Sequence, residues 1–309
     1  MASGSPISPA QLSSRLQRAI SPQLCEHLTR KGWAVADGVF GSDVTSALRT
    51  ELASLAPSMQ HNSTVLVHPA SGTSLLPKLA INEAELRDPA TCAAAPLCSA
   101  LQEDATLRVM LSLFLPGLRL ESQAIKAQHN TGGCFPIHTD SDFGVDGRCI
   151  TAIAYLNPGW QPWQGGELRL YPWPSEAVDI APLNDRLVLF SSKTMLHRVL
   201  PSRAADRYCF TMWLSEGRSQ ARPPTPLQPE VGTSEEAWRR LVHPSLRKHA
   251  ARWWLRDEWA ASLEQAHPPS PARDALLEGF WGELGIIERV VKPLVDRAQP
   301  PGPPVTEWL

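Results

Sequence analysis

The order of apolar and polar residues divides the chain into a helical beginning, a strand-rich middle and a helical end. Near the start, apolar residues recur at every fourth position from Leu12 to Leu24, which predicts one helix with a single buried stripe. A strand over residues 32–36 is expected next, followed by a second helix that is capped by Ser42 and extends to Leu55.

The middle of the chain, from about Leu118, predicts antiparallel sheet. Short runs rich in β-branched and aromatic residues alternate there with turn signals such as Asp146-Gly147. The predicted strands are residues 120–128, 135–139, 149–157, 167–171, 186–191, 196–200 and 207–215. This rhythm favours a double-stranded β-helix, or jelly-roll. Residues 57–100 have only weak periodicity, and we predict no element in them.

The end of the chain predicts helices after a proline-rich linker. Thr233-Ser234-Glu235-Glu236 fits a capping box, and Ser270-Pro271 begins a helix that reaches about Leu294. Six of the eleven tryptophans lie past residue 230, which indicates that these helices pack on the outside of the barrel. They are Trp238, Trp253, Trp254, Trp259, Trp281 and Trp308.

We therefore predict an α+β fold, with a β-helix core between amino-terminal helices and a carboxy-terminal helical extension. The predicted parts are a disordered tail over residues 1–10, a helical and stranded support region over residues 11–117, the core over residues 118–220, and the linker with its helical extension over residues 221–309.

Composition narrows the class of protein. Hydrophobic residues make up 43% and charged residues 19%, as in ordinary globular proteins, and a net charge of -2 gives no reason to expect nucleic acid or a membrane as a partner. The chain has no apolar run of about 18 residues. Six cysteines without a CxxC pair argue against a zinc site and a disulfide framework, and favour an intracellular location in cytoplasm or nucleus. An organellar transit peptide is the alternative for the serine-rich residues 1–25.

The most specific chemical signal is His138-Thr139-Asp140, followed at a distance by His197. Residues two apart on a strand point to the same face, so His138 and Asp140 can bind one ion together. With His197 they would form a facial set of two imidazoles and one carboxylate, which suits ferrous iron because it leaves positions open. The other histidines, read as surface or loop residues, include His61, His68, His129, His243, His249 and His267.

A carboxylate site is expected next to this metal site. Arg207 offers a planar fork of donors that matches a carboxylate, and Tyr155 would converge on the same barrel interior with its hydroxyl. A small dicarboxylate would fit, with one end on the metal and the other on this pair. Strand alternation places Ile153, Thr211 and Trp213 on the same faces, Leu168 would form a pocket wall, and Cys209 is read as a small buried thiol.

These residues resemble the iron- and 2-oxoglutarate-dependent dioxygenases, and within them the prolyl 4-hydroxylases of the oxygen-sensing type. The resemblance covers roughly residues 30 to 215. Its motifs are His138-Thr139-Asp140, Asp146-Gly147-Arg148-Cys149-Ile150-Thr151, Tyr155-Leu156-Asn157, Gly165 to Pro172, Asp185 to Phe190, His197, Arg207-Tyr208 and Thr211-Met212-Trp213. The resemblance implies hydroxylation of a C–H bond, that of a prolyl residue in a protein, with release of succinate and carbon dioxide.

The resemblance also implies ligands and roles. Fe(II) would be bound by His138, Asp140 and His197, and the far carboxylate of 2-oxoglutarate by Arg207 and Tyr155. Dioxygen would be the second co-substrate and L-ascorbate an accessory reductant, and Thr211 and Trp213 would lie near 2-oxoglutarate. Two features depart from the family. Gln128 stands where these hydroxylases place a tyrosine, and residues 60–90 do not match their basic substrate loop.

Three alternatives differ in substrate or class. The same chemistry could act on a small metabolite, with residues 57–95 and 141–148 deciding between metabolite and protein. Nucleic-acid demethylation is suggested by residues 238–256, where six basic residues lie beside three tryptophans without an acid, although a solvated helix face is the simpler interpretation. A non-catalytic scaffold is the third alternative. The oligomeric state is left open by the sequence.

Overall fold

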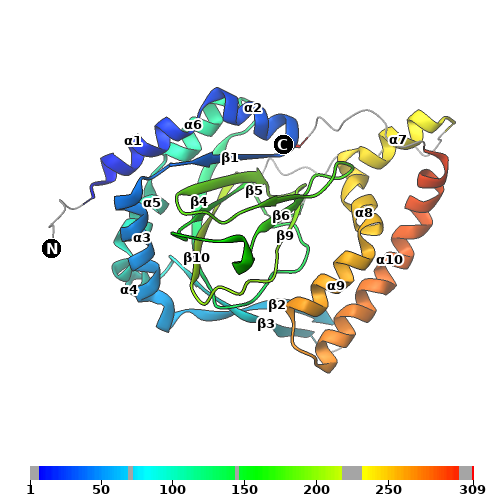
Figure 1. Ribbon diagram of the computed structural model, residues 1–309. Helices are drawn as coiled ribbons and strands as arrows, with labels where there is room; N and C mark the ends of the chain where they lie inside the picture. Colours follow the sequence, from blue (N-terminus) through cyan, green and yellow to red (C-terminus); the bar gives the residue numbers. More distant parts are fainter. Residues whose placement is uncertain (1–6, 69–71, 143–145, 218–231, 299–307) are drawn as a thin grey trace.

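The computed structural model describes residues 7–68, 72–142, 146–217, 232–298 and 308–309, and places a β-barrel between two groups of helices (Figure 1). The larger sheet of the described chain is antiparallel, with strand order β1-β8-β5-β10-β4-β3-β2. Its strands are β1 (Trp33–Asp37), β2 (Gln60–His68), β3 (Gly72–Glu85), β4 (Leu120–Asn130), β5 (Arg148–Tyr155), β8 (Arg186–Ser191) and β10 (Arg207–Glu216). The smaller sheet is β7-β6-β9, with β6 (Leu168–Tyr171), β7 (Val178–Ile180) and β9 (Leu196–Val199). The predicted double-stranded β-helix is confirmed.

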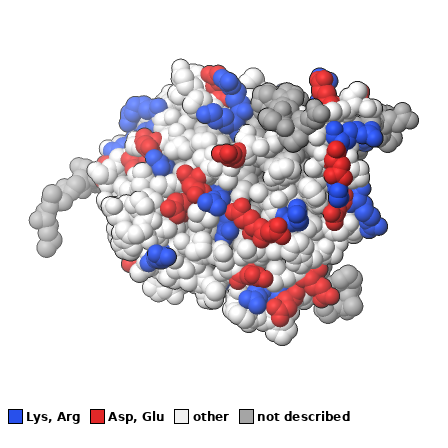
Figure 2. All heavy atoms as spheres, turned by 45° about the vertical axis from the view of Figure 1, so that its right-hand side comes forward, with Lys and Arg blue, Asp and Glu red and all other residues white. Residues whose placement is uncertain are grey.

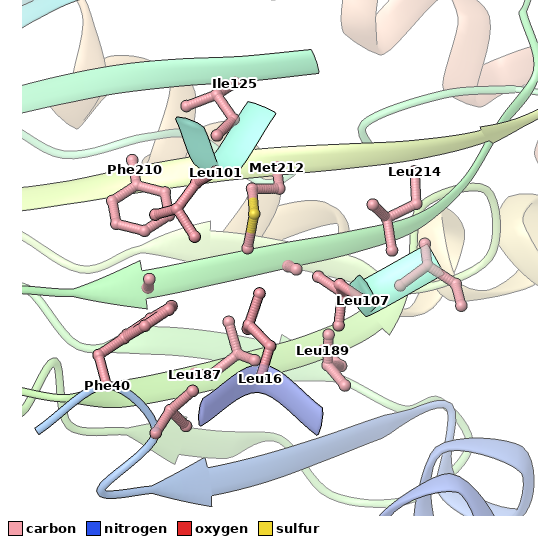
Figure 3. Packing of buried hydrophobic residues seen from close by; sticks show 14 of the residues in the cluster. Leu16, Phe40, Leu101, Leu107, Ile125, Leu187, Leu189, Phe210, Met212 and Leu214 are labelled. Atoms are coloured by element: carbon pink, nitrogen blue, oxygen red, sulfur yellow. The ribbon is translucent and has the colours of Figure 1, made fainter. Parts of the chain in front are cut away.

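The six α-helices described before β4 cover the outer face of the larger sheet (Figure 1). They are α1 (Pro9–Ala19), α2 (Pro22–Lys31), α3 (Ser42–Leu55), α4 (Pro89–Ala94), α5 (Pro96–Glu103) and α6 (Thr106–Phe114). Figure 3 shows Leu16 of α1, Leu101 of α5 and Leu107 of α6 among side chains of the sheet, such as Phe210 and Met212. One apolar cluster therefore joins the helices to the sheet.

The single helix predicted from Leu12 to Leu24 is in fact two. Ile20 is extended, the Ser21 hydroxyl accepts from the Leu24 N–H as the cap of α2, and Pro22 occupies the first turn, where its missing N–H costs nothing. Helix α1 begins at Pro9, inside the segment predicted to be a disordered tail. Residues 1–6 of that tail and residues 218–231, which include the predicted linker, lie outside the described residues.

Two sequence predictions within the middle region need correction. Residues 135–139 form only an isolated bridge between His138 and His197, because Pro136 has no N–H to donate to a ladder. Residues 57–100, for which we predicted no element, contain the β2–β3 hairpin and helix α4. The hairpin shifts register between His61 and Ser63, which breaks the alternation that would have revealed it.

The carboxy-terminal helices pack against the smaller sheet, as predicted (Figure 1). They are α7 (Ser234–Val242), α8 (Pro244–Trp254), α9 (Arg256–Ala266) and α10 (Pro271–Arg297), and Thr233 and Ser270 cap the first and last of them as expected. Their apolar cluster includes Ile137, Tyr171, Trp173 and Leu196 of the barrel. Burial of the tryptophans is partial, since Trp254 and Trp281 are 51% and 44% exposed.

None of the helices within the described residues has the length and apolar character needed to cross a membrane.

Candidate metal centre

The three predicted metal ligands converge at one end of the barrel. His138 and Asp140 follow β4, His197 lies in β9, and their ligand atoms all lie within 4.8 Å of one another. The backbone N–H groups of His138 and His197 donate to each other's carbonyls at 3.0 and 2.9 Å. Oδ1 of Asp140 is 3.7 Å from Nε2 of His138 and 3.8 Å from Nε2 of His197. An ion at this point would have two imidazole ligands and one carboxylate.

Backbone carbonyls orient both imidazoles. Nδ1 of His138 is 2.8 Å from the Pro136 carbonyl, and Nδ1 of His197 is 3.2 Å from the Met195 carbonyl. Since a carbonyl oxygen can only accept, each Nδ1 carries the proton, and the lone pair of each Nε2 points toward Asp140. Both rings are therefore in the tautomer that binds a metal through Nε2.

The carboxylate of Asp140 is held from its other side. The Thr151 hydroxyl donates to Oδ2 at 2.5 Å, and the Ser192 hydroxyl lies 2.8 Å from that of Thr151. Burial alone would raise the pKa of Asp140, but the positive charge that the nearby imidazoles carry when they are protonated, together with the Thr151 hydrogen bond, outweighs burial and holds the pKa well below its usual range. Burial, with His138 beside it, lowers the pKa of His197 to about 4. The site thus combines an ionised carboxylate with a neutral imidazole, the protonation states that metal binding requires.

Arg207 and Tyr155 meet in the barrel interior, as the sequence predicted. Their exposed fractions are 3% and 1%, and the guanidinium carbon of Arg207 lies 5.2 Å from the centre of the Tyr155 ring. Nε of Arg207 donates to the Gly166 carbonyl at 2.9 Å. Nη2 of Arg207 and the Tyr155 hydroxyl are buried without a hydrogen-bond partner in the described chain. Burial raises the pKa of Tyr155 despite the nearby Arg207, so the hydroxyl keeps its proton.

Gly166 makes room for the Arg207 side chain. A Cβ atom built at Gly166 would lie 2.9 Å from Cδ and 3.0 Å from Nε of Arg207, and the φ of Gly166 is +78°, a conformation that side chains rarely adopt. Glycine at position 166, just before β6, is therefore required both by its backbone conformation and by the close packing of Arg207.

The remaining predicted residues differ in how deeply they are buried. Ile153 and Leu168 share an apolar cluster with Tyr155 and Cys209, and Thr211 is 4% exposed. Trp213 is only partly buried, lies between Arg148 and Lys126, and has an indole Nε1 without a partner among the described residues.

The structure also places the residues around the predicted site, including two arginines close to Arg207 in sequence. Arg203 is exposed, and Nη2 of Arg198 donates to Gln265, so neither competes with Arg207 for the interior. Gln128, which departs from the family pattern, accepts from the Cys209 thiol at 3.3 Å. Sequence reasoning gave no role to Thr151, although it lies two residues before Ile153 and four before Tyr155 and therefore shares their strand face.

The prediction that His267 is a surface or loop residue was wrong. His267 is fully buried, not on the surface, with Nδ1 3.1 Å from the Pro77 carbonyl and Nε2 3.2 Å from the Thr64 hydroxyl. It joins the helical extension to both strands of the β2–β3 hairpin, a contact between segments distant in sequence.

Residues 124–215 match the family model of the 2OG-Fe(II) oxygenase superfamily. The matched segment, which contains all three candidate metal ligands, resembles the core of the 2OG-Fe(II) oxygenases. Prolyl hydroxylase EGLN3 from Mus musculus is 42% identical over 87 residues, which are 27% of this chain and 36% of that protein. The chain therefore matches little more than a third of this curated relative's length.

Two solved structures extend the likeness beyond the core. A prolyl 4-hydroxylase from Phytophthora capsici has a TM-score of 0.75 at 29% identity, over 96% of this chain and 97% of that one, so the likeness includes the helical extension. A Trichoplax adhaerens prolyl hydroxylase, in complex with a hypoxia inducible factor peptide fragment, has a TM-score of 0.54 at 26% identity, over 67% of this chain and 91% of that one. The chain resembles the oxygen-sensing prolyl hydroxylases.

Proposed function

We propose that this protein is an Fe(II)- and 2-oxoglutarate-dependent dioxygenase that hydroxylates a prolyl residue of a protein or peptide and releases succinate and carbon dioxide. The observation that carries the proposal is the convergence of His138, Asp140 and His197, with ligand atoms within 4.8 Å of one another. Dioxygen is the second co-substrate, and L-ascorbate is the accessory reductant.

The residues fit ferrous iron. Two neutral imidazole nitrogens and one carboxylate oxygen on one side of an ion form the facial set of non-haem iron oxygenases, which leaves the opposite positions for the co-substrates. The carbonyls of Pro136 and Met195 hold the imidazoles in the required tautomer, and Thr151 holds the carboxylate. Bound Fe(II) would supply the redox chemistry that couples decarboxylation of 2-oxoglutarate to hydroxylation of a C–H bond.

The buried polar groups of Arg207 and Tyr155 fit the far carboxylate of 2-oxoglutarate. A buried donor without an acceptor is unfavourable, and both Nη2 of Arg207 and the Tyr155 hydroxyl are such donors within the described chain. A carboxylate between them would accept from both. Ile153 and Leu168, at 8% and 0% exposure, wall this interior and exclude water from it.

Arg207→Lys is expected to raise the KM for 2-oxoglutarate by about tenfold or more, because an ammonium cannot form the two parallel bonds of a guanidinium, and each lost charged hydrogen bond costs about 1.5–3 kcal/mol. Steady-state succinate formation at varied 2-oxoglutarate measures the effect. Arg203→Lys, at an exposed position, is the matched control and should keep the wild-type KM. Normal KM in Arg207→Lys would remove Arg207 from the co-substrate site.

Gly166→Ala is also expected to weaken 2-oxoglutarate binding, although it removes no polar group. The new methyl would press on Cδ and Nε of Arg207, and φ at +78° adds strain. We expect the KM for 2-oxoglutarate to rise while Fe(II) affinity changes little, because the metal ligands are elsewhere. Gly159→Ala, also at positive φ but with open space around its Cβ, controls for backbone strain. Equal KM values in the two variants would contradict the packing argument.

A prolyl substrate is supported by the names of the similar proteins and by the peptide bound to the Trichoplax adhaerens hydroxylase. The test is succinate formation by the full-length chain with a library of proline-containing peptides, compared with a metabolite extract and with matched peptides in which alanine replaces proline. We expect stimulation only by the proline peptides, with a gain of one oxygen atom in mass. Stimulation by the metabolite extract alone would assign a small-molecule substrate.

The basic stretch of residues 238–256 gives little support to a nucleic-acid substrate. Arg239, Lys248 and Arg252 form ion pairs with Glu235, Asp142 and Glu283. Arg247 is 3% exposed and stacks on the Trp308 ring at 4.2 Å. Figure 2 shows acidic and basic side chains interspersed over the extension rather than a field of one sign.

We also propose a cytoplasmic or nuclear location, with which six unpaired cysteines are compatible.

A further inference from the structure

The helical extension is hydrogen-bonded to the chain beside each metal ligand. Ile137, next to His138, donates its N–H to the Ser262 hydroxyl of α9 at 3.0 Å. Asp142, two residues past Asp140, pairs with Lys248 of α8 at 2.8 Å. Nη2 of Arg198, next to His197, donates to the side-chain amide oxygen Oε1 of Gln265 of α9 at 2.7 Å. Ile137 also belongs to the apolar cluster that joins the extension to the barrel.

The first of these contacts leads directly to a metal ligand. The Pro136 carbonyl and the Ile137 N–H belong to one planar peptide group. Its carbonyl accepts from Nδ1 of His138 at 2.8 Å, and its N–H donates to Ser262. The Ser262 hydroxyl in turn donates to the Trp259 carbonyl of α9 at 2.6 Å. A continuous series of hydrogen bonds therefore joins helix α9 to the His138 ring, and each bond polarises the next.

His138 depends on this support more than His197 does. His197 lies in strand β9 with a side chain that is 5% exposed, so packing restrains its ring. The His138 side chain is 36% exposed, and its segment has no strand ladder beyond the bridge to His197. Ser262 is fully buried, so its geometry is set by the helix and not by solvent.

We propose that Ser262 is a positioning residue for the metal centre: it fixes the Pro136–Ile137 peptide plane, and through it the direction in which Nε2 of His138 points. This inference rests on the proposed function, because it assumes that His138 binds the metal. It gives the extension a role in the site that its packing alone does not require.

The test measures binding of Co(II), as a redox-stable probe, to full-length wild type, Ser262→Ala and the control Leu284→Ala. Leu284 is 5% exposed in the same apolar cluster but lies on α10, away from the ligands, so its loss destabilises the extension without touching the hydrogen bonds. Co(II) dissociation constants are determined by calorimetry below all melting temperatures. We expect Ser262→Ala to raise the Kd about tenfold, as outer-shell partners of ligand histidines do, and Leu284→Ala to lower Tm with the Kd unchanged.

The inference would be overturned by an unchanged Co(II) Kd in Ser262→Ala, or by an equal rise of the Kd in Leu284→Ala. Metal binding by the wild type would in either case leave the proposed function intact. A wild type that binds no Co(II) would overturn both. If Ser262→Ala does not fold, Ser262→Cys replaces it, since a thiol keeps the volume and weakens the acceptor. The same rise in Kd is then required of Ser262→Cys.

Discussion

His138→Ala, Asp140→Ala and His197→Ala are each expected to reduce succinate formation to below about 1% of wild type, because loss of a ligand should exceed the 10–100-fold effects of outer-shell changes. The barrel should remain folded, since its strands pair through backbone hydrogen bonds that need no metal. Succinate release gives the activity, and circular dichroism with the melting temperature gives the fold.

His27→Ala, an exposed histidine on α2, is the matched control and should keep full activity. A triad variant that retained half of the wild-type turnover would remove that residue from the ligand set. Loss of the folded state in all three variants would instead show that the site is needed for stability.

Ending the chain after residue 220 is expected to destabilise the barrel strongly. The cut removes the partners of the apolar side chains of Ile137, Tyr171, Trp173 and Leu196. It also leaves the Tyr171 hydroxyl without Glu258, to which it donates at 2.6 Å. At about 25 cal/mol per Å² of apolar area, the lost contacts should cost several kcal/mol.

Thermal melting, binding of an apolar dye and light scattering measure the consequences of this truncation. We expect a lower Tm, more dye binding and aggregation, although every proposed metal ligand is retained. A truncated protein that stayed monomeric with the wild-type Tm would show that the extension is an independent module. Its basic residues should then be tested for a partner.

The periodicity of apolar residues predicted the strands whose own sequences carry a clear apolar pattern. Strands β5, β8 and β10 alternate or run apolar over their whole length, and their predicted positions agree with the structure to within two residues at each end. The predicted helix from Leu12 to Leu24 failed because its four-residue spacing continues across a break made by Ser21 and Pro22. The β2–β3 hairpin could not be predicted, since its strands are partly exposed and its register shifts.

The residues of the candidate site likewise fall into those that the sequence predicted and those that it did not. His138, Asp140 and His197 were predictable from their residue types and order in the sequence, although the first two do not lie on a strand. Strand parity also carried the signal for Arg207 and Tyr155. Thr151 and Ser262 were not predictable, since a hydroxyl gains its role only from the partner that the fold brings to it. His267 is buried by segments distant in sequence, which no local pattern records.

Anaerobic titration with Fe(II) and 2-oxoglutarate, followed by admission of dioxygen, tests the central claim most directly. We expect one Fe(II) per chain, 2-oxoglutarate binding that weakens in Arg207→Lys, and one succinate for each 2-oxoglutarate consumed after oxygen is added. His138→Ala should lose the Fe(II) binding. Full-length protein that bound no Fe(II), or bound it and formed no succinate even with the proline peptides present, would contradict the account.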